Sequence, residues 1–239
     1  MTDSRVLGIQ QPYFFPYIGH FALINYVDHY IFFDTPQYER RSWMNRNRIL
    51  NPNSDFSYIN VPLEKAPQKT AICDMNIDNS QEWREQIFAQ LTIYKKKAPY
   101  YNKTIEFLKE VLSPVFSTLS ELNIHTTKEV CRYIGINTSF DTFSELKLDL
   151  EDVNAPDEWA LRITEALNYD TYVNALGGME FFDRSKYTNA GINLKFMKTE
   201  LKPYVQRIGR FVEGLSIIDV MMFNTVEEIQ ELLTHYTLL

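Results

Sequence analysis

The sequence predicts an α/β fold, with a Rossmann-like, mostly parallel sheet flanked by helices and a helical insertion. At the N-terminus a strand, a helix and a second strand follow one another, as in the βαβ unit of parallel sheets. Helical periodicity dominates residues 81–135, and alternating elements return in the last third of the chain. We therefore expect a single α/β domain over residues 1–239, with residues 81–135 as a helical insertion within it.

The N-terminal unit is predicted from two apolar runs and the segment between them. Residues 5–9 form a short apolar run typical of a buried strand. The run stops before Pro12, because proline has no amide hydrogen for the ladder. Apolar residues at helical spacing predict a helix from residue 18 to about residue 28. The apolar residues 30–33 then predict the second strand.

The middle of the chain is predicted to change from strands to helices. Residues 57–62 and 72–77 alternate as strands do. After residue 81, apolar spacing and helix-breaking residues predict four helices. They are expected at 83–94, at 103–112, after Pro114, and from the capping box Thr126-x-x-Glu129 to Gly135.

The C-terminal third is predicted to alternate again. A strand is expected within 138–146 and a helix after Pro156, whose first turn carries acidic residues. Strands at 171–175 and 192–196 follow, and the patterns Ser216-x-x-Asp219 and Thr225-x-x-Glu228 predict two capped helices. Gly177 and Gly178, which follow a strand, are explained equally well as a phosphate cradle or as a plain turn.

Composition excludes several classes of protein. The formal charge of −7 argues against a broad nucleic-acid interface. The two cysteines, Cys73 and Cys131, have no short spacing and no histidine partner nearby, so we expect free buried thiols and no metal site. No apolar run reaches the ~18 residues of a membrane span, and the N-terminus has no signal-peptide pattern. The sequence therefore predicts a cytoplasmic protein that does not insert into a membrane.

The loop after the first strand is the first candidate site. Polar and aromatic residues follow this strand, and Gly19 and His20 fall in the first turn of the helix. Free backbone N–H groups at such a helix start are suited to phosphate. The layout resembles the nucleotidylyltransferases, although only the Gly-His of their His-x-Gly-His signature is present. Equally, Gly19 is explained as a packing glycine and His20 as a helix residue. The substrate-binding residues predicted here are Gln10, Gln11, Pro12, Tyr13 and Gly19.

The segment from Asp34 to Arg48, which follows the second strand, is the second candidate site. It holds four arginines among few counter-charges in an acidic protein. Arginine binds phosphate and carboxylate through two parallel hydrogen bonds, and a tryptophan face offers a stacking surface. A solvated loop with surface ion pairs is the alternative interpretation. The substrate-binding residues predicted here are Gln37, Arg41, Trp43, Asn45, Arg46, Asn47 and Arg48.

Taken together, these motifs resemble those of the WbqC-like proteins, which occur among bacterial O-antigen and other surface-polysaccharide genes. The resemblance spans nearly the whole chain, and its most specific part is the segment 33–49. It rests on Gln11-Pro12-x-x-x-Pro16-x-x-Gly19, Phe33-Asp34-x-x-Gln37-Tyr38-x-x-Arg41-x-Trp43-x-Asn45-Arg46-Asn47-Arg48-Ile49, Val61-Pro62, Tyr172-x-x-Ala175-x-Gly177-Gly178, Gly191-Ile192-x-Leu194 and Phe211-x-x-Gly214-Leu215-Ser216-Ile217-Ile218-Asp219. The resemblance implies the role proposed for this family, which is the transfer of a small group, such as glycine, in making an amino sugar of the surface glycan.

Three functions remain open from the sequence. The first is a transferase that acts on a phosphate-bearing substrate, such as a nucleotide-linked sugar or an activated amino acid. ATP or a sugar nucleotide is then the expected cofactor or substrate, with His20 and Asp34 as the catalytic acid/base groups. The second is a non-catalytic protein that binds a nucleotide, a sugar nucleotide or a partner. The third is an interaction protein that uses an exposed apolar patch on residues 81–135. The oligomeric state is not predicted.

Overall fold

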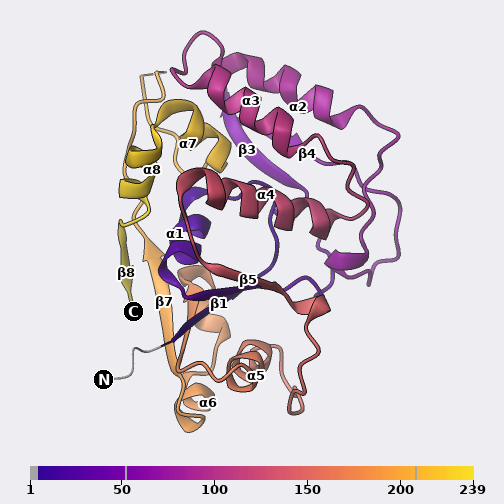
Figure 1. The fold of residues 1–239 in the computed structure, drawn as a ribbon, viewed down its shortest axis with the longest axis vertical. Helices are drawn as coiled ribbons and strands as arrows, with labels where there is room; N and C mark the ends of the chain where they lie inside the picture. Colours follow the sequence, from indigo (N-terminus) through magenta and orange to yellow (C-terminus); the bar gives the residue numbers. More distant parts are fainter. Residues whose placement is uncertain (1–4, 52, 208) are drawn as a thin grey trace.

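Six strands form the central sheet of the molecule, in the order β5-β2-β1-β6-β7-β8 (Figure 1). The structure is a computed structural model, which describes residues 5–51, 53–207 and 209–239. The strands are β1 (Val6–Gln10), β2 (His29–Phe32), β5 (Ser139–Thr142), β6 (Thr171–Ala175), β7 (Asn193–Thr199) and β8 (Tyr236–Leu238). Every neighbouring pair is parallel except β7 and β8. The predicted α/β fold with a mostly parallel sheet is confirmed.

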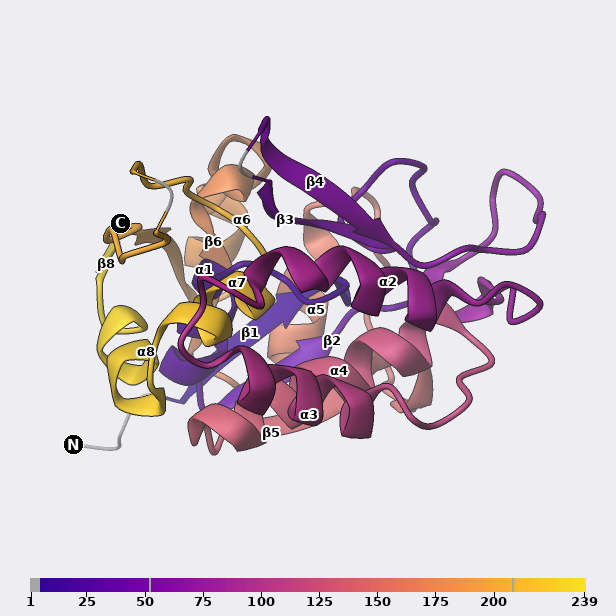
Figure 2. The ribbon, with the colours of Figure 1, turned by 90° about the horizontal axis from the view of Figure 1, so that it is seen from above.

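Helices and one separate hairpin surround this sheet. The hairpin pairs β3 (Arg46–Asn51) with β4 (Asp55–Asn60). It lies outside the sheet, next to α2 and α7 (Figure 2). The helices are α1 (Ile18–Tyr26), α2 (Trp83–Leu91), α3 (Tyr101–Val111), α4 (Leu119–Ile134), α5 (Glu158–Ala166), α6 (Arg184–Asn189), α7 (Ile217–Phe223) and α8 (Val226–Leu232). Four short 3₁₀ helices are η1 (Ile72–Asp74), η2 (Thr92–Tyr94), η3 (Phe143–Glu145) and η4 (Leu176–Phe181). None of the described helices is long and apolar enough to cross a membrane.

Both faces of the sheet are covered, because successive side chains of a strand point to opposite faces. In β2, Tyr30 and Phe32 belong to the larger apolar cluster, whereas Ile31 belongs to the smaller one. The larger cluster packs under α1, α4 and α7, and the smaller one under α5 and α6 on the other side of the sheet (Figure 1). This explains why the central strands β1 and β2 are mostly apolar.

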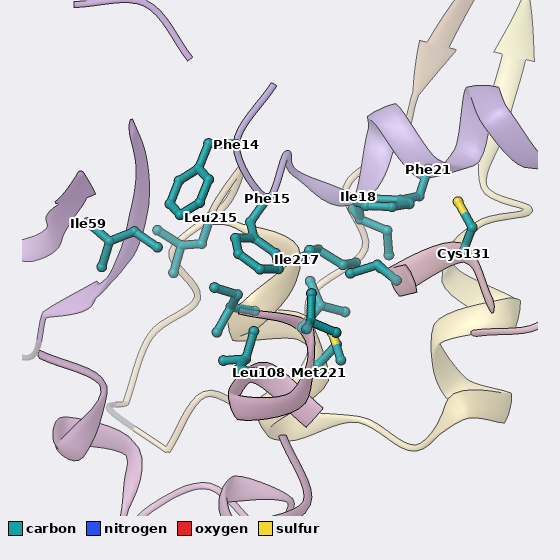
Figure 3. Packing of buried hydrophobic residues seen from close by; sticks show 14 of the residues in the cluster. Phe14, Phe15, Ile18, Phe21, Ile59, Leu108, Cys131, Leu215, Ile217 and Met221 are labelled. Atoms are coloured by element: carbon teal, nitrogen blue, oxygen red, sulfur yellow. The ribbon is translucent and has the colours of Figure 1, made fainter. Parts of the chain in front are cut away.

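The larger cluster also holds the first loop in place. Figure 3 shows Phe14 and Phe15 of that loop packed among side chains of other elements, including Leu215, Ile217 and Met221. Leu108 of α3 and Leu122 of α4 belong to the same cluster. The helices α2–α4 therefore share their apolar core with the N-terminal unit.

Two predictions of local structure in the middle of the chain are wrong. Residues 72–77 alternate in polarity, but they form η1 and isolated bridges. The third and fourth expected helices are one helix, α4, whose capping box is formed by Thr118 and Glu121. Thr126, the expected cap, lies buried in the middle of this helix. Its hydroxyl donates to the carbonyl of Asn123, so the threonine is accommodated within the helix. Gly135 ends α4 in a left-handed conformation, as predicted.

Segment 34–48 was expected to be a loop, but its last residues begin strand β3. Asn47 is buried, while Arg46 and Arg48 on either side of it are half-buried. This alternation is that of a strand with one covered face. Because Arg46 and Arg48 are charged, the sequence did not indicate this strand.

The expected apolar patch on residues 81–135 is absent. All of these residues are described, and Val115 is their one strongly exposed large apolar side chain. Cys131 is a buried free thiol, as predicted, whereas the free thiol of Cys73 is only half-buried.

Candidate functional site

The strand order places the candidate site at the carboxyl ends of β1 and β6. From β1 the chain first adds β2 and β5 on one side and then β6 and β7 on the other. Ligands of open α/β sheets bind where the order reverses in this way, because the loops after the two strands diverge and leave a crevice. A cavity of about 550 Å³ lies at this point. We call it the switch-point cavity.

Amide and aromatic side chains line the switch-point cavity. Gln10 and Gln11 come from the end of β1, and Asn174 from the end of β6. Trp159 and Phe181 also line it and remain 37% and 54% exposed, so aromatic surface is available to a ligand. The full lining is Ile9, Gln10, Gln11, Tyr13, Phe33, Thr35, Pro36, Glu39, Pro156, Trp159, Ala160, Tyr172, Asn174, Gly178, Phe181 and Phe182.

Gly178 leaves room for one of these amides. A Cβ atom at position 178 would lie 2.6 Å from Nδ2 of Asn174. The side-chain Oδ1 of Asn174 accepts a hydrogen bond from the backbone N–H of Ala175, at 2.9 Å. The amide of Asn174 is thereby fixed at the cavity wall. Among the residues that the structure describes, no lysine or arginine lines this cavity.

A second cavity, of about 990 Å³, adjoins the first one. Glu39 lines both. We call the second one the hairpin-side cavity, because Asn45 next to β3 contributes to it. Its lining contains the cations Arg40 and Lys65. Its other lining residues are Gln37, Tyr38, Asn45, Leu63, Glu64, Ala66, Pro67, Gln68 and Met75.

Burial removes His20 from titration near neutral pH, contrary to what the sequence predicts. The side chain is 4% exposed, and its Nε2 lies 2.8 Å from the hydroxyl of Tyr30. Desolvation lowers the pKa of His20 to about 3. The imidazole is also shielded by the ring of Tyr13, 5.6 Å away, and it does not line the switch-point cavity. A neutral buried imidazole is not poised to exchange protons with a substrate at neutral pH.

This burial predicts a dependence of stability on pH. Between the pKa of about 3 and the ordinary value of 6.5 the unfolded state binds a proton at His20 and the folded state does not. The free energy of unfolding therefore falls as the pH is lowered through this window, by about 5 kcal/mol at most from this group. Chemical denaturation at pH 3.5 to 7 should show a shallower fall for His20→Gln. Equal slopes for the two proteins would contradict the assignment.

Asp34 is buried just beyond the carboxyl end of β2. Its carboxylate accepts hydrogen bonds from the hydroxyls of Ser144 and Ser120, at 2.7 and 3.2 Å, and from the backbone N–H of Ser144. It borders a cavity of about 720 Å³ beside α4, which is separate in its lining from the switch-point cavity. The structure therefore does not bring the two predicted catalytic residues together in one cavity.

Two of the predicted binding residues on the first loop, Pro12 and Gly19, are engaged inside the protein. The carbonyl of Pro12 accepts a hydrogen bond from Asn123. A Cβ on Gly19 would lie 2.5 Å from the ring of Tyr17, which favours the packing interpretation of this glycine. Tyr13 instead lines the switch-point cavity together with Gln10 and Gln11.

The side-chain amides of the two predicted binding asparagines donate hydrogen bonds to backbone carbonyls. The amide of Asn47 donates to the carbonyls of Phe14 and Phe15, at 3.0 and 2.9 Å. Asn45 donates to the carbonyl of Val61 and accepts from the hydroxyl of Tyr38, both at 3.0 Å. Of the two, only Asn45 lines a cavity, the hairpin-side one, and Gln37 lines it too.

Two of the three predicted binding arginines, Arg46 and Arg48, lie over aromatic rings on the hairpin or just before it. Arg46 lies 4.3 Å from the ring centroid of Tyr58, and Arg48 lies 5.3 Å from that of Trp43. Arg46 donates to the carbonyl of Arg41, and Arg48 donates to that of Gly214 at 2.8 Å. Within the described parts of the chain Arg41, Arg46 and Arg48 form no ion pair. Trp43 is 41% exposed on this surface, apart from both cavities.

The sequence did not identify the residues beyond position 50 that line the switch-point cavity, nor the acid Glu39. Asn174 stands at the end of a correctly predicted strand, so the rule that ligands lie at carboxyl ends was sufficient to select it. Glu39 was passed over in a run of arginines. Trp159 and Phe181 carry no sequence signal, because their place at the cavity depends on the packing of α5 and η4.

Known sequences resemble this chain over nearly its whole length. The model of the WbqC-like protein family matches residues 11–231. The uncharacterized protein Rv1507c of Mycobacterium tuberculosis is 25% identical over 234 residues, which cover 97% of this chain and 98% of that protein. No solved structure matches the chain.

Proposed function

The chain belongs to the WbqC-like protein family, and we propose that it is a cytoplasmic transferase of bacterial surface-polysaccharide (O-antigen) biosynthesis. Its proposed substrate is a phosphate-bearing sugar precursor, such as a nucleotide-linked sugar, and an activated amino acid is a further candidate for the transferred group. The pathway follows from the role implied for the family. The ligand follows from one observation, the amide- and aromatic-lined cavity at the carboxyl ends of β1 and β6.

The chemistry of this lining suits a sugar or nucleoside ring. Such a ring offers an apolar face to aromatic side chains and hydroxyl groups to amides, which both donate and accept hydrogen bonds. Trp159 and Phe181 supply exposed aromatic surface, and Gln10, Gln11 and Asn174 supply three amides. A few polar groups within an apolar wall are typical of sites that orient a small molecule.

Glu39 is the proposed proton acceptor of the transfer. It is exposed, and among the described residues no other carboxylate lines the switch-point cavity. In the proposed step a hydroxyl or amine of the acceptor attacks the activated carbon of the donor and loses its proton to Glu39. The bond from that carbon to the phosphate oxygen breaks, and the phosphate leaves with the electron pair. His20 and Asp34 are held inside the protein and take no part in this step.

Binding of a sugar nucleotide should depend on the cavity wall. Trp159→Ala and Asn174→Ala should each weaken binding about tenfold or more, because each removes a stacking face or a fixed amide. A thermal-shift screen of uridine, guanosine and thymidine diphosphate sugars identifies the ligand, and titration calorimetry measures its affinity. The control is Trp43→Ala, which removes an equally exposed tryptophan on the hairpin. Loss of binding in this control alone would move the site to the arginine-bearing surface.

A non-catalytic binding protein of the same pathway is the second candidate function. It is favoured by the observation that both predicted catalytic groups, His20 and Asp34, are satisfied by internal partners. Turnover of the ligand found in the screen separates the two functions. The transferase requires that Glu39→Gln lose turnover while affinity is kept. Binding without turnover in the unmodified protein, with any acceptor supplied, supports the second candidate.

A further inference from the structure

We propose that the hairpin-side cavity is an anion subsite that holds the phosphate or carboxylate group of the substrate at Arg40 and Lys65, while the ring lies in the switch-point cavity. The assignment of the ring rests on the proposed function. The anion subsite does not, since it follows from the charges and shape of the second cavity.

Two cations of this cavity are available to a ligand. Neither Arg40 nor Lys65 forms an ion pair within residues 5–51, 53–207 and 209–239. Two acids, Glu39 and Glu64, line the same cavity, and Glu64 accepts a hydrogen bond from Asn76 at 3.3 Å. Because neither acid forms an ion pair with Arg40 or Lys65 in the described residues, the two cations keep donors that suit phosphate and carboxylate.

A third positive charge lies within electrostatic range. Burial raises the pKa of Tyr38, a cavity residue, and the charges of Arg40 and Arg46 act in the opposite direction. Arg46 is not among the residues that line the cavity, and its guanidinium lies over the ring of Tyr58. The side chain of Asn45 is held there by Tyr38 and Val61, which leaves a preorganised polar wall.

The two cavities are placed to take one extended ligand. Glu39 lines both, and the next residue, Arg40, lines the hairpin-side cavity. The volumes of about 550 and 990 Å³ accommodate a ring in the first and one or two phosphate groups in the second. The ring and its anionic group thus bind on either side of Glu39, which both linings share.

Anion binding is tested with inorganic pyrophosphate and with acetate, by calorimetry at low ionic strength. Pyrophosphate should bind, and Arg40→Gln and Lys65→Gln should each weaken it about tenfold, as expected for loss of a charge-assisted hydrogen bond. Lys109→Gln, on the exposed surface of α3, is the matched control and should leave the affinity unchanged. If acetate binds and pyrophosphate does not, the anion is a carboxylate. No binding of either anion, or an equal loss in the control, overturns the subsite.

Two further variants separate this result from the proposed function. Glu39→Gln should tighten pyrophosphate binding severalfold, because it removes a like charge next to the anion. Trp159→Ala should leave pyrophosphate binding unchanged even if it abolishes binding of sugar nucleotides. Weaker pyrophosphate binding in Glu39→Gln would contradict the placement of the anion. Failure of every sugar nucleotide to bind would reject the proposed function and leave the anion result standing.

Discussion

Replacing Asp219 by alanine is expected to lower the free energy of unfolding by about 4 kcal/mol, which is the largest effect of a single substitution predicted for this protein. The carboxylate is fully buried. It accepts hydrogen bonds from Tyr94, Tyr204 and Gln206, at 2.7, 2.5 and 2.9 Å. Alanine would leave three donors without an acceptor in the core, and each unsatisfied buried group costs about 1 to 3 kcal/mol.

The network around Asp219 joins segments that are far apart in the chain. Tyr94 also accepts a hydrogen bond from the backbone N–H of Leu50, at the centre of the hairpin. Gln206 accepts from the N–H of Val212 and so fixes the segment that leads into α7. Asp219 was expected to complete a capping box with Ser216, but its carboxylate serves this network instead. Removing it should loosen the hairpin against α7.

Asp219→Asn gives the matched control and should cost less than alanine. The amide keeps one acceptor for Tyr204 and Gln206, but its NH₂ group faces the hydroxyl of Tyr94, which already accepts from Leu50. Urea denaturation at pH 7 measures both variants. Equal destabilisation by alanine and asparagine would contradict this expectation, because asparagine keeps the volume and one acceptor of the aspartate.

Burial also raises the pKa of Asp219, and the sign of the consequence is opposite to that for His20. The folded state holds the proton of Asp219 at a pH where the unfolded state has released it. From this group alone, the free energy of unfolding falls as the pH rises from about 3.8 through the raised value, and it is constant above that. Asp219→Asn should remove this part of the pH dependence.

The sheet was predictable because its strands are coded locally. Residues 5–9, 30–33 and 171–175 are apolar runs that end at polar or turn residues, and each forms a parallel strand. Segment 72–77 alternates in polarity but forms η1 and isolated bridges. In α4, the pattern Thr126-x-x-Glu129 resembles a capping box but lies inside the helix. Local signals of this kind are decided by tertiary context.

The candidate site was only partly predictable. Of the binding residues predicted on the first loop and at the end of β1, Gln10, Gln11 and Tyr13 line the switch-point cavity. The polar residues of segment 34–48 were expected to face a ligand, but a sequence does not show whether an amide binds a ligand or its own backbone. For Asn47 the structure shows the backbone. Binding by each of the predicted residues stays a prediction.

Replacing Asn47 by alanine is therefore expected to destabilise the protein by about 3 kcal/mol, in contrast to the small effect expected of a ligand-binding residue. Asn47 is 4% exposed. It donates to the carbonyls of Phe14 and Phe15 and accepts from the N–H of Arg48 at 2.8 Å. Phe15 has a φ of 39°, in the left-handed region that bulky residues rarely occupy. The hydrogen bonds to its carbonyl from Asn47 and Ser216 hold this strained conformation.

Urea denaturation of Asn47→Ala, with Asn60→Ala as the control, decides between the two interpretations. Asn60 is exposed on the neighbouring strand β4, and its loss should change the free energy of unfolding by less than 0.5 kcal/mol, as is usual for surface substitutions. A stable Asn47→Ala protein that has lost its sugar-nucleotide affinity would restore Asn47 as a binding residue. A destabilised protein would show that the amide of Asn47 holds the backbone of the first loop. The same hydrogen bonds would then help to position Tyr13 at the wall of the switch-point cavity.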